Sequence, residues 1–150
     1  MLISQLIGTW RGEGAGEYPT IESFTYAEEL TFKDVGKPFL LYQQLTWSPS
    51  GAPMHTETGF LRAPGPEAIE FIIAQPTGQT ELAEGTYTTT DGGFELRLEA
   101  RIMNSATAKI VDATQRRIAV ADNQLTYDFA MAAVGVPMTH HLAASLTRVD

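Results

Sequence analysis

Apolar side chains occupy every second position in several runs of this chain, and turn residues separate the runs. In Phe94–Arg101 apolar residues alternate with Glu and Arg, and in Leu125–Ala132 they alternate with Thr, Asp and Ala. Successive side chains of a β-strand point to opposite faces, so this alternation predicts strands with one buried face. Turn signals such as Pro64–Pro66 and Asp91–Gly93 follow the runs closely, as in sheets built from hairpins.

The spacing of these runs predicts about ten antiparallel strands. So many consecutive strands leave no open edge if they close into an up-and-down barrel, which is wide enough to hold one small ligand. A two-sheet sandwich is the competing architecture. Helical signal is confined to Ser4–Ile7, a possible single turn, and Asn104–Asp112 is ambiguous. The predicted strands are Thr9–Gly14, Phe24–Phe32, Phe39–Trp47, His55–Arg62, Ile69–Gln75, Thr80–Thr88, Phe94–Arg101, Ile118–Val120, Leu125–Ala132 and Thr139–Val149.

Composition narrows the function. A chain of 150 residues suits one domain, so we expect a single domain across 1–150. The absence of cysteine excludes disulfides, thiolate metal sites and a Cys nucleophile. A net charge of −8 disfavours nucleic acid and anionic membrane partners. The first residues lack the features of a signal peptide, and no run reaches the roughly 18 apolar residues of a membrane span, so we expect a cytoplasmic protein.

The densest local pattern is the glycine-rich segment Gly8–Thr20. Pro19 and the β-rich residues after it leave no room for the helix that a dinucleotide-binding loop requires. One interpretation is a kinked first strand in which Trp10 fills the core. The other is that the glycines thin the barrel wall, so that a large flat ligand can lie against the backbone.

The three histidines are His55, His140 and His141. None of them forms a zinc-ligand pair on one strand face, because adjacent strand residues point to opposite sides. Only one of His140 and His141 is therefore expected to face the interior. Hydrophobicity favours the face that His140 shares with Leu142, whereas a roomy cavity favours the smaller residues beside His141, and the pattern does not decide between them.

Other catalytic arrangements lack support in the sequence. The acidic residues are scattered, and no pair is placed at the separation that a glycosidase requires. No nucleophile elbow of the form G-x-S-x-G is present. Lys109 lies among small residues, where a solvated lysine is the ordinary expectation.

Several motifs together resemble the nitrobindin family. The first is Gly8–Thr20 with Ile21, which is similar to the family's G-x-W-x-G-x-G…Y-P-T-I signature. Four further segments, in the same order, extend the resemblance over nearly the whole chain. They are Gly51–Phe60, Ile69–Phe71, Leu82–Gly85 and Val136–Leu142.

The resemblance implies a ten-stranded barrel of the calycin type, shaped like fatty-acid-binding proteins, that holds one haem b per chain. It implies that His141, the histidine immediately before Leu142, is the axial iron ligand, and that the ferric haem isomerises peroxynitrite to nitrate and binds nitric oxide. The implied haem contacts are Gly8, Trp10, Gly12, Gly14, Thr20, Lys109 and His141. If His141 faces inward, strict alternation also predicts Ala143 and Ser145 as lumenal residues.

Two alternative functions use the same barrel. A carrier of a fatty acid or another apolar ligand needs a buried basic residue for the ligand carboxylate, and Arg97 and Arg101 would provide one if their strand face is lumenal. A haem-based sensor of nitric oxide would share the haem site and differ only in the absence of turnover.

Overall fold

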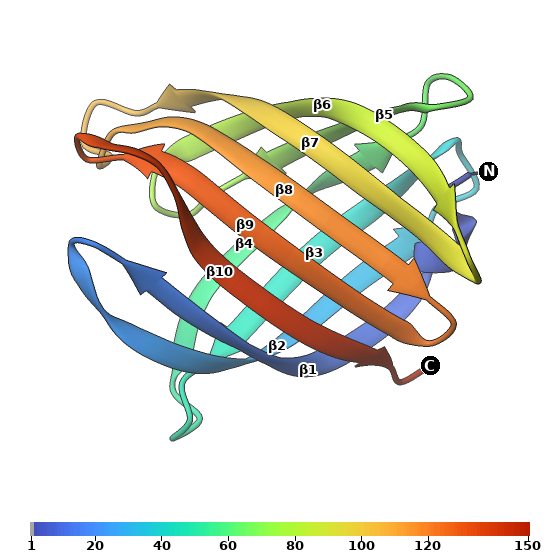
Figure 1. Ribbon diagram of the computed structural model, residues 1–150, viewed down its shortest axis with the longest axis horizontal. Helices are drawn as coiled ribbons and strands as arrows, with labels where there is room; N and C mark the ends of the chain where they lie inside the picture. Colours follow the sequence, from blue (N-terminus) through green and yellow to red (C-terminus); the bar gives the residue numbers. More distant parts are fainter. Residues whose placement is uncertain (1) are drawn as a thin grey trace.

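The computed structural model describes residues 2–150 as a closed barrel of ten antiparallel strands (Figure 1). Each strand pairs with its neighbours along the chain, and β1 pairs with β10 to close the barrel. The predicted up-and-down barrel is therefore confirmed, and the sandwich alternative is wrong. The strands are β1 (Gly8–Tyr18), β2 (Ile21–Asp34), β3 (Phe39–Trp47), β4 (Pro53–Arg62), β5 (Ala68–Ala74), β6 (Gln79–Thr90), β7 (Gly93–Asn104), β8 (Val111–Ala121), β9 (Gln124–Ala133) and β10 (Val136–Arg148).

Alternation located the strands well. The bounds of β3 match the predicted run, whereas β8 is longer than the predicted Ile118–Val120. The ambiguous segment Asn104–Asp112 holds the end of β7, a turn and the start of β8. Within residues 2–150, no helix is long and apolar enough to cross a membrane.

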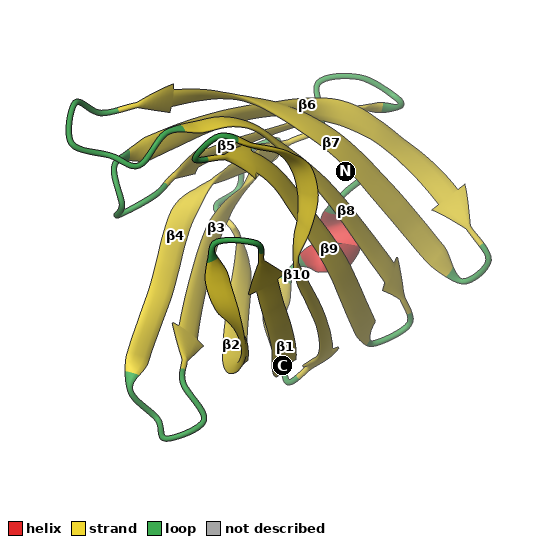
Figure 2. Cartoon of the chain, turned by 60° about the vertical axis from the view of Figure 1, so that its left-hand side comes forward, coloured by secondary structure: helices red, strands yellow, loops and turns green. Residues whose placement is uncertain are grey.

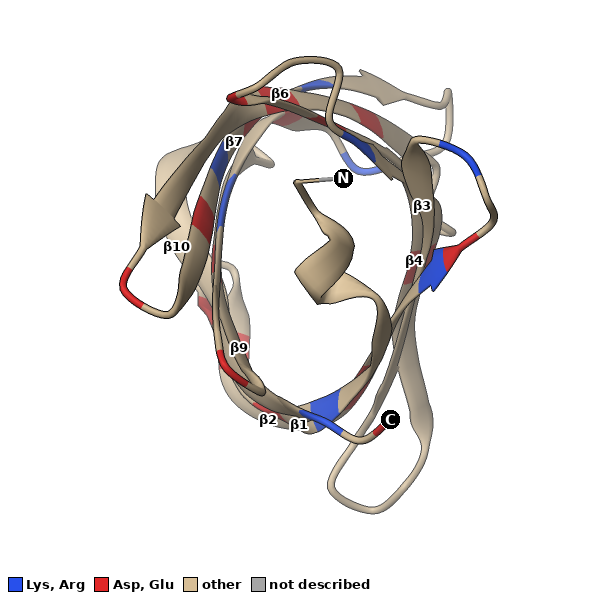
Figure 3. Cartoon of the chain, turned by 90° about the vertical axis from the view of Figure 1, so that its right-hand side faces the viewer, with Lys and Arg blue, Asp and Glu red and all other residues tan. Residues whose placement is uncertain are grey.

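A short 3-10 helix, η1 (Ser4–Leu6), lies inside the outline of the barrel when the molecule is viewed from the end where both termini lie (Figure 3). Trp10 is fully buried beside it and donates its indole N–H to the Leu6 carbonyl at 2.9 Å. The Arg148 guanidinium lies 4.3 Å from the Trp10 ring centroid and donates to the Gln5 and Ile7 carbonyls. These contacts hold the N-terminal segment in place and close this end.

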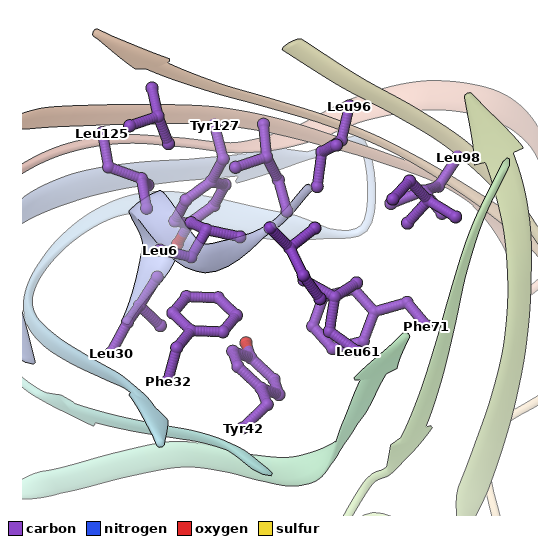
Figure 4. Close-up of a cluster of buried hydrophobic side chains, with 14 of the residues drawn as sticks. Leu6, Leu30, Phe32, Tyr42, Leu61, Phe71, Leu96, Leu98, Leu125 and Tyr127 are labelled. Carbon is purple, nitrogen blue, oxygen red and sulfur yellow. The ribbon is translucent and has the colours of Figure 1, made fainter. Parts of the chain in front are cut away.

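The closed half of the barrel is filled by apolar side chains (Figure 4). Because the strands alternate, their inward residues meet in the lumen and their outward residues face water. The inward set contains the alternating residues identified from the sequence, including Phe94, Leu96, Leu98, Leu125, Tyr127 and Phe129. The opposite end has no such filling, and it is formed by the β1–β2, β3–β4, β5–β6, β7–β8 and β9–β10 turns (Figure 2).

Close packing of β1 against β10 requires glycine at position 12. Gly12 pairs with Leu146 across the closing ladder, and a Cβ at this position would collide with the Ser145 carbonyl oxygen and the Leu146 Cα. Both atoms belong to backbone, so they cannot move aside without a shift of the strand.

We therefore expect Gly12→Ala to destabilise the barrel by about 1–3 kcal/mol, the usual effect of overpacking. Thermal unfolding should show this as a lower Tm, by about 2–4 °C for each kcal/mol. Glu13→Ala is the matched control, because Glu13 is the exposed neighbour of Gly12 on the same strand. Equal Tm values for the two variants would contradict the close approach of the strands.

Candidate haem and ligand site

A cavity of about 580 Å³ occupies the open end of the barrel. Its volume falls within the range of about 300–1,000 Å³ that is typical of cofactor and small-molecule sites. Aromatic and aliphatic side chains form much of its wall, and a smaller number of polar groups lies among them. Its wall includes Phe24, Phe129, Met131, His55, His141 and Arg116.

His141 reaches this cavity through a β-bulge in β10. His140 pairs with Ala130 and Leu142 pairs with Phe129, which leaves His141 as an extra residue with no partner in the ladder. A bulge shifts the alternation by one position. His141 and Leu142 therefore both line the cavity, whereas His140 is exposed outside the barrel.

The bulge corrects one expectation from strict alternation. We predicted Ala143 and Ser145 as lumenal companions of His141, and this is wrong. Ser145 is exposed, while Ala144 and Leu146 are buried on the inner face. The hydrophobic pattern therefore gave the correct inner face for the end of β10, and the bulge adds His141 to that face.

The ladder between β1 and β10 ends at the Gly16–Leu142 pair, and beyond it side-chain hydrogen bonds connect β1 to β10 and to β9. His141 Nδ1 lies 2.9 Å from the Glu17 carbonyl oxygen. The Tyr18 hydroxyl donates to the Met131 carbonyl at 3.0 Å and accepts from the Ala133 amide at 3.1 Å. Figure 1 shows the β1–β2 hairpin diverging from β10 in this region.

The environment of His141 favours a neutral ring with one nitrogen free. A carbonyl oxygen only accepts, so Nδ1 carries the proton and Nε2 keeps its lone pair. Burial lowers the pKa of His141; the Glu17 hydrogen bond opposes this effect, and the charges of His140 and His55 add to it. The rings of Tyr18, Phe24 and Phe129 surround the imidazole, with centroids 5.4, 6.3 and 6.1 Å away.

Among the other expected haem contacts, Thr20 and Lys109 line the cavity at its mouth. Gly8, Trp10, Gly12 and Gly14 do not, so their expected direct contact with a flat ligand is not supported. Trp10 instead fills the closed end of the core, in agreement with the first interpretation of this motif.

The glycines shape the cavity indirectly. A Cβ on Gly14 would collide with the Tyr26 ring, and one on Gly16 would collide with the Phe24 ring. Because Gly14 and Gly16 have no side chains, the Tyr26 and Phe24 rings of β2 can lie directly against β1 at these two positions. Both rings line the cavity.

A buried ionic cluster lies below the apolar wall, and sequence reasoning missed it. Arg116 donates to Glu81 at 2.7 Å and to Glu57 at 3.3 Å. Gln75 donates its amide N–H groups to the same two carboxylates, at 2.9 Å to Glu57 and 2.6 Å to Glu81. Tyr42 donates to Glu57 at 2.8 Å. Arg116 is an even-numbered residue of β8, like the buried Thr114, Ile118 and Val120, and this shared parity could have identified it as lumenal.

The arginines argue against a fatty-acid carrier. Arg97 and Arg101 have side chains that are 68% and 77% exposed, and they pair with Glu95 and Glu84 on the outer face. The inward-facing Arg116 is already paired with two carboxylates. None of these three residues is free to hold a ligand carboxylate in the cavity.

A third buried acid, Glu28, adjoins the cavity wall beside Tyr127 and Gln44. Glu28 is only 2% exposed and accepts hydrogen bonds from Tyr127 at 2.7 Å and Gln44 at 2.6 Å. The Tyr127 and Tyr26 hydroxyls are 2.6 Å apart. Burial raises the pKa of Glu28 to about 7; the hydrogen bonds from Tyr127 and Gln44 oppose this effect, and the charge of Glu57 adds to it.

The residues of this cavity fit a haem group. Its aromatic and aliphatic wall can accommodate a planar macrocycle. The His141 imidazole can bind iron, and the Glu17 carbonyl fixes the orientation of this ring. The haem carboxylates are matched by Lys109 and Thr20 at the mouth. Arg116 is already paired with Glu57 and Glu81.

Comparisons with known proteins agree with this assignment. The profile of the family described as "THAP4-like, heme-binding beta-barrel domain" matches residues 2–148. The chain is 52% identical to a peroxynitrite isomerase of Nocardia farcinica, over 97% of this chain and 88% of the relative. It is 46% identical to peroxynitrite isomerase 2 of Mycobacterium marinum, over 97% and 92% of the two chains. The crystal structure of Rv2717c from M. tuberculosis superposes with a TM-score of 0.96 at 44% identity, covering 99% of this chain and 95% of that one.

Glu28 predicts a pH dependence of stability. Its folded-state pKa of about 7 lies above the ordinary value of 4.5, so the unfolded chain releases this proton first as pH rises. The contribution of Glu28 is therefore complete below pH 4.5 and is lost by pH 7, a change of up to about 3 kcal/mol. Urea unfolding of the wild type and of Glu28→Gln across this range should show the variant gaining relative stability as pH rises. A difference that stays constant with pH would contradict a proton on Glu28.

Proposed function

Because the chain belongs to the family of THAP4-like heme-binding β-barrel domains, we propose that it binds haem b through His141 and isomerises peroxynitrite to nitrate. The family expected from the sequence motifs is confirmed by the profile match and by relatives of about half identity. The isomerase activity follows the names of the relatives from Nocardia farcinica and Mycobacterium marinum. One haem per chain, nitric oxide binding and a cytoplasmic location complete the proposal.

The hydrogen bond between His141 and Glu17 is the observation that carries this function. It holds the ring in one tautomer, with Nε2 as the nitrogen available to iron. The same ring lies between Tyr18, Phe24 and Phe129, which restrict its rotation. A histidine held in this way can bind iron without first losing a proton, because its pKa is already lowered.

Each remaining part of the proposed mechanism belongs to a residue of the cavity. Lys109 and Thr20 would hold the haem carboxylates at the mouth. Phe24, Phe129 and Met131 would exclude water from the macrocycle and keep reactive fragments within the cavity. When bound, haem supplies the redox-active centre at which peroxynitrite rearranges. The conversion to nitrate conserves atoms, electrons and charge, so it needs no reductant and no second substrate.

A haemin titration of the apo-protein tests the proposal directly. We expect a saturable one-to-one Soret change for the wild type and for His140→Ala. His141→Ala should lose more than tenfold in affinity, because the axial nitrogen is removed. His140→Ala is the matched control, since the two histidines are adjacent and only His141 lines the cavity.

Circular dichroism of each variant confirms that the barrel is intact. Peroxynitrite decay in the presence of the haem-loaded protein then separates an isomerase from a sensor of nitric oxide. Loss of the Soret change in both variants, or in neither, would contradict His141 as the ligand. Loosely adsorbed haemin in the wild type would overturn the haem function as a whole.

A further inference from the structure

We propose that His55 binds the anionic substrate on the side of the cavity opposite His141, with Glu57 and Gln75 as its positioning residues. This inference rests on the function proposed above and adds a substrate-binding residue to it. His55 belongs to the Gly51–Phe60 motif, whose chemical role the sequence did not reveal.

The topology places the two histidines on facing walls. His55 lies on β4 and His141 on β10, and three strands separate them in one direction around the barrel and five in the other. Both side chains line the same cavity, and His55 adds to the lowering of the pKa of His141 by its charge. A small anion held in this cavity would therefore be within reach of the wall that carries His55 as well as the wall that carries His141.

Hydrogen bonds fix the orientation of His55. Its Nε2 lies 2.5 Å from the Gln75 Oε1 and 3.5 Å from the Glu57 Oε1. The Gln75 amide N–H groups are directed to Glu57 and Glu81, so Gln75 Oε1 can only accept, and His55 Nε2 donates. Nδ1 is then the ring nitrogen left for a ligand. The His55 side chain is 41% exposed and lines the cavity.

The buried cluster of Glu57, Glu81 and Arg116 below His55 favours a positive charge on the His55 ring. Glu57 and Glu81 face a single guanidinium, that of Arg116, so protonated His55 brings the group to neutrality. Burial alone would raise the pKa of Glu57, but Arg116, His55 and Tyr42 lower it to about 2. Burial alone would lower the pKa of His55. The hydrogen bonds to Glu57 and Gln75 and the charge of Glu57 outweigh burial and the charge of Arg116, and the pKa is raised.

Other charged or titratable groups that line the cavity are Lys109 at the mouth, His141 on β10 and the tyrosines Tyr18, Tyr26 and Tyr127. Glu28 lies behind the wall, on the Tyr127 hydroxyl. Peroxynitrite and nitrate are both anions. A protonated imidazole donates a charge-assisted hydrogen bond to an anion from Nδ1, while Nε2 stays on Gln75 and Glu57. The role is to hold and orient the anion, and no proton changes place in the net reaction.

Nitrite is a suitable probe, because it is a small nitrogen-oxygen anion across the whole titration range. We expect His55→Leu to weaken nitrite binding to the haem-loaded protein about tenfold or more at pH 6, as read from the Soret band. The difference between the two proteins should shrink as pH rises through the raised pKa of His55, because the wild type then loses its proton. His140→Leu, a change of the exposed histidine outside the barrel, should follow the wild type across this pH range.

Two further readouts separate this inference from the haem function. His55→Leu should still bind haemin with a saturable one-to-one Soret change, because the axial nitrogen proposed for iron belongs to His141, and its loss of nitrite affinity should exceed any loss of affinity for uncharged nitric oxide. In the apo-protein, NMR titration should place the pKa of His55 above 6.5, and Glu57→Gln should lower it. Failure of the wild type to bind haemin would overturn the proposed function. Normal haemin binding with equal nitrite affinity in the wild type and His55→Leu would overturn the role of His55 alone.

Discussion

The pairing of β1 with β10 closes the barrel, and the point where it stops creates the cavity site. Up to Gly16 and Leu142 the two strands share a continuous ladder, and Gly12 allows them to approach. Beyond that pair the hydrogen bond from His141 to the Glu17 carbonyl replaces the ladder. The Glu17 carbonyl of β1, which lies beyond the last pair of the ladder with β10, therefore fixes the orientation of the His141 side chain of β10. A regular β10 without its bulge would complete the wall and direct His141 outward.

The lumen is divided into three layers, and each has a different physical role. Apolar side chains fill the closed half and provide the burial that stabilises the fold. The layer around Arg116 contains buried carboxylates, and it is tolerable only because each charge meets a partner. The cavity above it is apolar on the wall that carries His141 and polar near His55. This asymmetry explains why burial and neighbouring charges lower the pKa of one histidine, while a buried carboxylate raises the pKa of the other.

The sequence predicts the barrel because alternation is a local signal that each strand carries by itself. Alternation could not place His141, and only the family resemblance implied it, because a bulge is defined by the pairing of two strands and leaves no mark in the spacing of one. The Gly8–Thr20 motif was ambiguous for a similar reason. A glycine in a strand indicates that another group packs closely against the backbone, but it does not identify that group. Here the neighbours of Gly14 and Gly16 are the Tyr26 and Phe24 rings. The inward position of Arg116 was missed because the predicted strand began at Ile118, whereas β8 begins at Val111.

The division of charge also reconciles an acidic protein with an anionic substrate. A net charge of −8 repels anions at long range, but salt screens exposed charges beyond about 10 Å. Within the cavity the local groups dominate, and these include Lys109 at the mouth and His55 on the wall, whose pKa is raised. Glu57 and Glu81 are nearby, yet Arg116 occupies both of them. An anion that enters the mouth therefore meets hydrogen-bond donors first, and Glu57 below raises the pKa of His55.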